Sequence, residues 1–279
     1  GRVIDLNPNP SEVIDLANPR FSDGFVEDNR CLKYDQFLSY LKQMNFSEKD
    51  KAEIVTTQQT SFTGSLLGVK LSKPFKEERD FLFLIAKVFW DPSIDIHSQA
   101  LQTCYFALLG KPFHAPQCPT FGEHWTAIGF QGEDPRTDLN RSMGIFAVLQ
   151  VLHFVEVHPT SCADLIVTLN ATDKFNANTF FCVALGFSLS VITTLRRGAL
   201  NAFCGKSSPL TVAHELHHAQ CFELLHRLKG LSSTDSRLAQ ESSLELWDHI
   251  NDIRVELSKK DKTVKKYIDN YIATLRMTP

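Results

Sequence analysis

The residues best suited to metal chemistry lie in the stretch His214-Glu215-Leu216-His217-His218, which fits the HExxH pattern of zinc peptidases. A helix would place His214 and His218 on one face, four positions apart, with Glu215 between them as a base for a metal-bound water. Such a site also needs a third ligand and an open coordination position. The stretch therefore raises the hypothesis of a zinc hydrolase.

The surroundings of this stretch argue against that hypothesis. The stripe that holds the two outer histidines continues along the same helical face as Cys221, Leu225 and Leu228. An apolar stripe of this kind predicts a face that packs on neighbouring helices. Glu241 and Glu245 are candidate third ligands, but both belong to an ordinary polar helix face. We therefore reject a metal site at His214, Glu215 and His218, and we expect no cofactor.

Length and charge limit the remaining classes of function. The chain has 279 residues, of which 43% are hydrophobic and 22% are charged. This composition is typical of one principal folded domain with extensions. The net charge of -3 argues against a protein that neutralises phosphates over a broad surface, so we expect no nucleic-acid partner.

Cysteine spacing and hydropathy bear on the compartment. The seven cysteines form no CxxC pair, which favours a reducing environment over a disulfide framework. The apolar run from residue 180 to residue 191 contains Gly186, Ser188 and Ser190, and it is shorter than the roughly 20 residues that a spanning helix needs. We also expect no signal peptide before the fold. We therefore predict a cytoplasmic protein with no membrane span.

Helical periodicity runs through most of the chain, and no strand alternation of any length interrupts it. Residues 57–74 and 118–135 resemble connections, because they are rich in small residues, glycine or proline. The fold class is therefore all-α, an irregular multi-helix bundle. The predicted helices cover residues 34–41, 75–90, 93–110, 141–157, 161–169, 178–197, 208–229 and 238–275, with a further helix starting near residue 47.

Two extensions flank the predicted helical domain at residues 31–230. Residues 1–30 predict an extended arm, because three prolines accompany a repeated Val-Ile-Asp-Leu sequence. This arm either folds back on its own domain or docks a partner. Residues 231–279 predict a C-terminal amphipathic helix or helical pair. The lysines in it form either a solvated face or an anchor for an acidic surface; they are Lys259, Lys260, Lys262, Lys265 and Lys266.

The segment 125–154 reads WTAIGFQGEDPRTDLNRSMGIFAVLQVLHF. Gly129 and Gly132 bracket an aromatic residue, which suits a tight turn that anchors a ring in the core, and Pro135 stiffens the exit. Asp138 or Asn140 is placed to cap a helix that begins near residue 141. The segment therefore predicts a rigid loop that delivers a polar group at a helix N-terminus.

This segment resembles the signature of the ELMO-domain (engulfment and cell motility domain) family, and the resemblance extends less sharply from residue 79 to residue 229. The signature combines a tryptophan, a Gly-Phe-Gln-Gly turn, a Pro-x-Thr-Asp stretch and an Arg-Gly-x-Gly segment before a leucine-rich helix. The residues that match it are Trp125, Gly129, Phe130, Gln131, Gly132, Pro135, Thr137, Asp138, Leu139 and Gly144.

In the single-domain branch of that family, the resemblance implies GTPase-activating activity on Arf-like small GTPases in their GTP-bound form. The arginine of the signature would be the catalytic group, here Arg141. An arginine supplied to a GTPase in trans contributes about 10³ to 10⁵ in rate, because its planar, permanently charged fork stabilises the charge that develops on the phosphates. The other matching residues, from Trp125 to Asp138, would position the arginine and bind the GTPase.

The sequence departs from the signature at the arginine itself. Asn140-Arg141-Ser142-Met143 is one residue longer than the family spacing, and Ser142 stands where a glycine is expected. If the extra residue lies in the loop, Arg141 keeps its place; if it lies in the helix, the side chain rotates by about 100°. Aligned from the left, the family position is Asn140, which carries no charge.

A second hypothesis follows from this departure. The multidomain branch of the family lacks the arginine and works as a scaffold, so the resemblance also implies a non-catalytic adaptor. In that case residues 1–30 and the basic C-terminal helix would dock the chain in a large cytoplasmic assembly, cytoskeletal or ciliary.

Overall fold

The computed structural model describes residues 31–59, 70–110, 119–172, 179–205, 207–234, 243–259 and 261–277. Most of these residues are helical and none is in a strand, which confirms the all-α multi-helix fold. The predicted arm at residues 1–30 lies outside the described residues, and so do residues 60–69 of the first predicted connection and Cys118 of the second.

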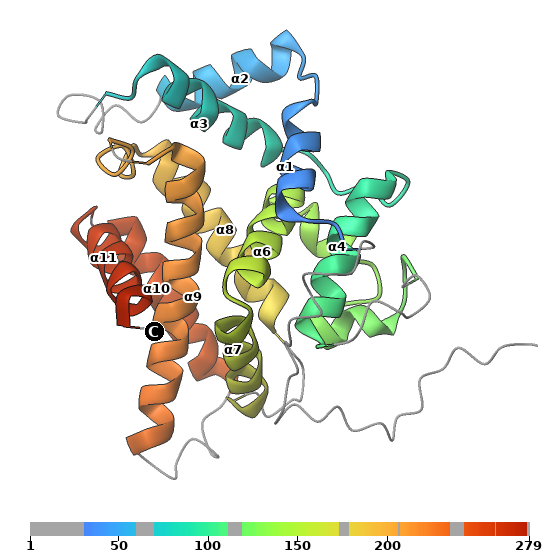
Figure 1. The fold of residues 1–279 in the computed structure, drawn as a ribbon, viewed down its shortest axis with the longest axis vertical. Coiled ribbons are helices and arrows are strands. Elements are labelled where there is room, and N and C mark those ends of the chain that lie inside the picture. The colour runs from blue at the N-terminus through green and yellow to red at the C-terminus, as the bar shows by residue number, and fades with distance from the viewer. Residues whose placement is uncertain are drawn as a thin grey trace, which may run out of the picture.

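The helices are numbered in chain order, and η2 is a short 3-10 helix (Figure 1). They are α1 (Tyr34–Lys42), α2 (Glu48–Gln59), α3 (Lys73–Ile85), α4 (Asp95–Leu108), η2 (Glu123–Ile128), α5 (Arg136–Leu139), α6 (Gly144–Val157), α7 (Pro159–Thr172), α8 (Phe180–Arg196), α9 (Pro209–Thr234), α10 (Ser243–Lys259) and α11 (Asp261–Met277).

Helix α6 lies at the centre of the bundle, with α8 and α9 on one side and α4 on the other (Figure 1). From Ile145 to Leu152 its side chains are fully buried on every face, polar Gln150 included. A helix that is apolar all round is stable only when other elements surround it. Here α1, α3, α4, α7, α8 and α9 all pack against it.

The C-terminal segment folds as two helices, which agrees with the expected helical pair, and both helices join the core. Val264, Ile268 and Tyr271 of α11 are buried, and α11 packs along α9. Arg227 of α9 donates to the Glu256 carboxylate of α10 at 3.1 Å. The exposed lysines described on α11 are Lys262, Lys265 and Lys266, and their role as an anchor stays a prediction.

Two helix ends that face each other were predicted wrongly. The helix expected at 75–90 ends at Ile85, because Lys87 and Val88 donate to Leu84 and Ile85 in tight turns. The helix expected from residue 141 begins at Gly144 instead. Both ends belong to one contact, since the carbonyl of Val88 accepts the N–H of Ile145 at 3.0 Å.

Two further expectations concern membrane helices and cysteines. No single described helix has the length and apolar character of a membrane span, although the sharply bent pair 144–157 and 159–169 meets that test when its halves are added together. The described cysteines, which leave out Cys118, form no disulfide with one another, and all but Cys182 are buried.

The packing of α9 predicts a contrast between two leucine truncations. Leu216 of α9 is fully buried, whereas Leu275 of α11 is 40% exposed. Leu216→Ala leaves a cavity in the core and should lower the free energy of unfolding by about 2 to 5 kcal/mol. Leu275→Ala should lower it by less than about 1 kcal/mol. Urea unfolding of both variants measures this, and equal losses would contradict the packing described.

Candidate functional site

The site begins with a turn that buries two aromatic rings. Trp125 is 1% exposed and its indole N–H donates to the carbonyl of Thr120 at 3.0 Å. Phe130 stacks on Phe181 of α8, with ring centroids 4.4 Å apart. Between them Gly129 adopts a φ of 102°, and a Cβ there would lie 2.6 Å from the backbone nitrogen of Phe181. Only glycine fits this approach of the turn to α8.

Gly132 differs from Gly129, although the sequence suggested a similar role. It has no positive φ, and a Cβ at Gly132 would meet no atom within 4 Å. Its absent side chain is therefore not required by the backbone of this turn.

The buried carboxylate of Asp138 bonds both the backbone of the turn and the side chain of Arg141. Asp138 is 1% exposed, and one of its oxygens accepts the backbone N–H of Gln131 at 2.7 Å. The other oxygen accepts a hydrogen bond from Nη2 of Arg141 at 2.8 Å, and the side-chain oxygen of Gln131 accepts from the same nitrogen at 3.0 Å. The expectation that Asp138 or Asn140 caps the following helix is wrong, because α6 begins after Met143 without a side-chain cap.

Asn140 is bound to a second turn, 50 positions away in the sequence. Its Oδ1 accepts the N–H of Trp90 at 2.8 Å, and its Nδ2 donates to the carbonyl of Trp90 at 3.2 Å. Both polar atoms of the carboxamide are therefore used on the backbone of one residue. Asn140 therefore joins two turns through its side-chain hydrogen bonds, and its carboxamide is not available to a partner protein.

Gly144 closes the same contact. It adopts a φ of +49°, and a Cβ there would lie 2.1 Å from the carbonyl oxygen of Val88. A side chain is excluded by both its conformation and its close approach to that carbonyl. We call residues 88–90 and 139–145 together the double turn.

The double turn leaves Arg141 exposed. Its side chain is 65% exposed, while the carboxylate that holds it is almost completely buried. The structure thus separates the two positions that the sequence left open, since Asn140 is bound to Trp90 and Arg141 carries its guanidinium to the surface. Ser142 follows with its N–H on the carbonyl of Leu139 at 3.2 Å.

Pro135 and Thr137, the remaining predicted residues, lie in the short segment that precedes Arg141. Thr137 donates its hydroxyl to the carbonyl of Asp134 at 2.8 Å, and Pro135 is buried. Arg136 lies 4.8 Å from the ring of Phe121 and pairs with Asp134. The hydrogen bond from Arg136 lowers the pKa of the Asp134 carboxyl below its usual value. The side chains of Asp134, Arg136 and Thr137 are therefore held by contacts within this segment and with Phe121, while Pro135 anchors it from below.

The exposure of Phe89 and the raised pKa of Cys182 were not predicted from the sequence. Phe89 is 66% exposed and lies in the double turn, with its Cα 3.7 Å from the position of a Cβ on Gly144. The sequence placed Phe89 inside a helix, which concealed its exposure. Burial raises the pKa of the Cys182 thiol on α8 to about 12, and the nearby Asp138 carboxylate adds to this shift.

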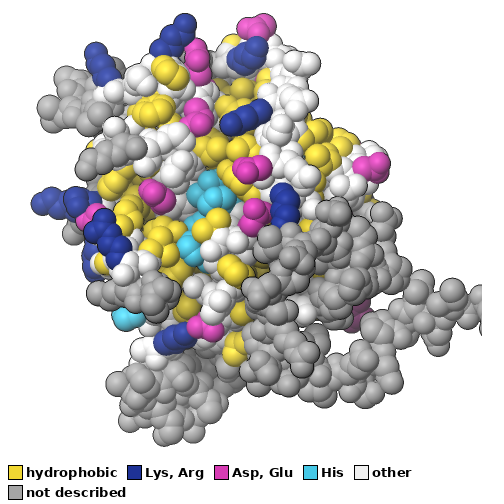
Figure 2. Space-filling view, in the orientation of Figure 1, with side chains coloured by type: hydrophobic (Ala, Val, Ile, Leu, Met, Phe, Trp, Pro, Cys, Tyr) yellow, Lys and Arg dark blue, Asp and Glu magenta, His cyan; other side chains and the backbone are white. Residues whose placement is uncertain are grey.

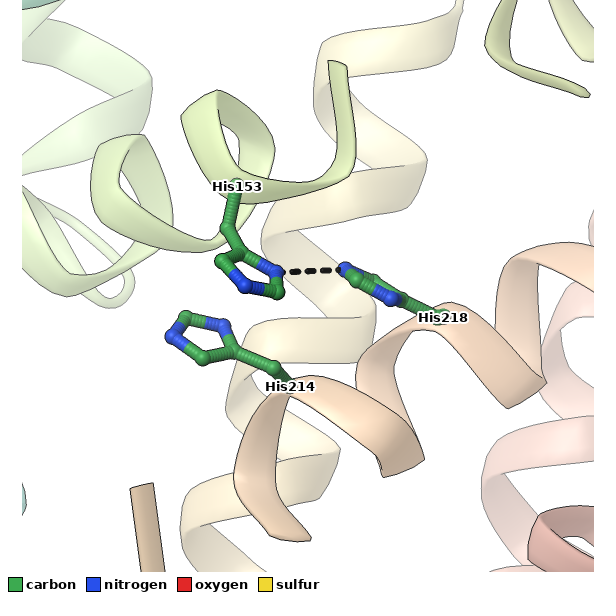
Figure 3. A group of neighbouring side chains, drawn as sticks. All are labelled: His153, His214 and His218. Atoms are coloured by element: carbon green, nitrogen blue, oxygen red, sulfur yellow. Dashed lines mark hydrogen bonds between the residues drawn. The ribbon is translucent and has the colours of Figure 1, made fainter. Parts of the chain in front are cut away.

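The structure brings a third histidine to the two rejected as metal ligands. His214 and His218 are buried on α9, and His153 of α6 lies against both (Figure 3). Among the described residues, this is the group of three whose ligand atoms lie within 4.8 Å of one another, and Glu215 is not part of it. Glu241 lies outside the described residues, as does the side chain of Glu245.

Burial keeps these imidazoles neutral. It lowers the pKa of His153 to about 4, and it places the pKa values of His214 and His218 well below the usual value. His153 could not be found from the sequence, because it lies on a different helix, in an apolar segment where a lone histidine carries no spacing signal. Without Glu215 the group lacks the base that a zinc hydrolase needs.

The fold and site define a helical bundle that presents an arginine from a pinned turn. The family model for the ELMO/CED-12 family matches residues 81–228, so the chain belongs to that family. The chain is similar to ELMO domain-containing protein 3 of Mus musculus and of Homo sapiens, each 26% identical over 94% of this chain and 68% of the relative. The corresponding protein of Bos taurus is 24% identical over the same shares. No solved structure matches the chain.

A glycine pair tests the double turn. Gly144→Ala forces a Cβ against the carbonyl of Val88 and should lower the free energy of unfolding by on the order of 3 kcal/mol. Gly132→Ala is the matched control, because open space surrounds that position, and it should change stability by less than about 0.5 kcal/mol. Thermal and urea unfolding compare the two. A harmless Gly144→Ala would show that the turns do not meet as described.

A pH measurement tests the second support of the turn, His97 of α4. Its Nδ1 accepts the N–H of Asp91 at 3.2 Å, and its Nε2 lies 3.4 Å from the hydroxyl of Tyr40. Burial lowers the pKa of His97 to about 4, although the Asp91 carboxylate opposes the shift. As the pH falls from about 6.5 to about 4, the unfolded chain binds a proton that the folded chain does not. Stability therefore decreases, by at most about 1.4 kcal/mol per pH unit from this one group.

The variant His97→Gln should flatten the dependence of unfolding free energy on pH in that range. His226→Gln changes an exposed histidine of α9 and serves as the control. Chemical unfolding at a series of pH values gives the slopes. Identical slopes for the parent chain and His97→Gln would mean that His97 is protonated in the folded protein.

Proposed function

We propose that this chain is a GTPase-activating protein for Arf-like small GTPases and that Arg141 enters the nucleotide site of the GTPase. The observation that carries the proposal is an exposed guanidinium held by a buried carboxylate on a pinned turn. Catalysis of GTP hydrolysis depends on positioning and on stabilising charge, so a pre-oriented arginine supplies what the GTPase lacks.

The hydrogen bonds of Arg141 leave part of its fork available. Both bonds to Asp138 and Gln131 use Nη2, and no described residue bonds Nη1 or Nε. Those donors remain for phosphate oxygens, in the planar geometry that suits two oxygens at once. The carboxylate would hold the arginine on one side while the phosphates bind on the other.

The surface beside Arg141 supports a protein partner. Phe89 is 66% exposed on the double turn and Phe121 is 47% exposed beside Arg136. Exposed aromatic and arginine side chains are the types that most often dominate protein interfaces. Membership of the ELMO/CED-12 family agrees with a protein partner of this kind.

Single-turnover GTP hydrolysis with a panel of Arf-like GTPases tests the proposal. Addition of the parent chain should accelerate hydrolysis by one of them, and Arg141→Ala should remove about 10³-fold or more of the acceleration. Arg141→Lys should recover only part of it, because lysine offers a point charge without the fork. Since Asp138 keeps its bond to Gln131, the variants should fold, and their thermal melting is measured alongside.

Arg136→Ala is the matched control, because Arg136 is an exposed arginine five positions away that is paired with Asp134. It should retain most of the acceleration. Equal rates with and without the parent chain, over the whole panel, would contradict the proposal and leave the non-catalytic adaptor. In that alternative, the exposed lysines of α11 would bind an acidic surface of a cytoskeletal or ciliary assembly.

A further inference from the structure

We propose that His153, His214 and His218 form a binding site for a divalent transition-metal ion, with Zn²⁺ as the natural occupant. The site joins α6 to α9 and is independent of the double turn and of any action on a GTPase. It has no base in position for hydrolysis, because Glu215 is not part of the group. The ion would therefore tie the helices together.

One pair of ligand atoms already lies at the separation that an ion requires. Nδ1 of His153 and Nε2 of His218 are 3.2 Å apart. Two nitrogens on one tetrahedral zinc are separated by roughly 3.3 Å when each Zn–N bond is about 2.0 to 2.1 Å. His214 completes the group within 4.8 Å, and its ring is stacked on His153 with the centroids 3.9 Å apart.

The outer contacts of the rings match those of metal-bound histidines. Such histidines almost always give the hydrogen of their other ring nitrogen to an oxygen, which fixes the ring. Nδ1 of His218 lies 3.2 Å from the hydroxyl of Tyr271, which is itself 2.6 Å from Nε2 of His158. While Nε2 of His218 binds the ion, Nδ1 keeps this partner.

His214 has an oxygen partner at each ring nitrogen. Its Nε2 lies 2.7 Å from the hydroxyl of Tyr34, and its Nδ1 lies 2.9 Å from Oε1 of Gln150. Whichever nitrogen binds the ion, the other is still held. Gln150 is fully buried, and its Nε2 has no hydrogen-bond partner among the described residues. This unpaired amide lies beside the histidines, where the hydrogen bonds of the protein alone do not satisfy it.

The chemistry of the group selects the ion. Three neutral imidazoles, with no thiolate or carboxylate in the group, suit Zn²⁺, Cu²⁺, Ni²⁺ and Co²⁺ and disfavour Mg²⁺ and Ca²⁺. An ion reaches the site from the surface, since His153 is only partly buried. Histidine side chains are visible in the space-filling view where α6 and α9 pack together (Figure 2).

Metal titration of the chelator-treated full chain tests the proposal, with Co²⁺ and Zn²⁺ as probes. The parent chain should bind one equivalent of Co²⁺ with the visible absorption of four-coordinate cobalt, and Zn²⁺ should displace it. His153→Gln and His218→Gln should abolish the absorption, and Tyr271→Phe should weaken binding by roughly 10-fold. His226→Asn, on an exposed face of the same helix, should bind as the parent does.

Absence of stoichiometric binding by the folded parent chain would overturn the proposal, and so would binding that survives both cluster substitutions. X-ray absorption of the zinc-loaded parent keeps the test independent of how the variants fold. It should show three imidazoles and no sulfur around the ion. A first shell with sulfur, or with fewer than three imidazoles, would place the ion elsewhere and overturn the assignment.

Discussion

The double turn is the constraint on which the surface of this protein depends. The carbonyl of Val88 accepts the N–H of Ile145, next to Gly144 in α6. The carboxamide of Asn140 bonds both the N–H and the carbonyl of Trp90. These bonds end α3 early and delay the start of α6. Arg141 lies between the two attachments, so its backbone is fixed while its side chain remains exposed. A loop without them would have to lose conformational freedom at the moment of binding.

The core provides the rigidity that the double turn needs. Helix α6 is surrounded by other helices, and Gly129 allows the aromatic turn to meet the backbone of α8. The same central helix carries His153 on another part of its surface, against α9. One helix thus supports an arginine at its N-terminal end and an imidazole group farther along. The proposed ion would reinforce the helix pair without touching the arginine.

The helical class and most helix positions could be predicted because they depend on local periodicity. The buried stripe with His214 and His218 was recognised in this way, whereas the turn that buries Phe130 was predicted from its glycines. The missing details depend on contacts between distant positions. Asn140 meets Trp90 across 50 positions, and His153 meets His218 across 65, so neither pairing leaves a pattern in the sequence. The exposure of Phe89 was missed for the same reason, because it follows from the early end of α3. That end depends on the hydrogen bond between the Val88 carbonyl and the N–H of Ile145 in α6.

The central claim is that the pinned Arg141 meets charge that develops on a nucleotide of another protein. The most direct measurement is the affinity of the chain for an Arf-like GTPase loaded with GDP, with and without fluoroaluminate, which mimics the transferring phosphoryl group. Fluoroaluminate should tighten binding by on the order of 100-fold or more, because catalytic groups bind the transition state best. Arg141→Ala should remove this gain. Equal affinity with and without fluoroaluminate would contradict a catalytic role for Arg141.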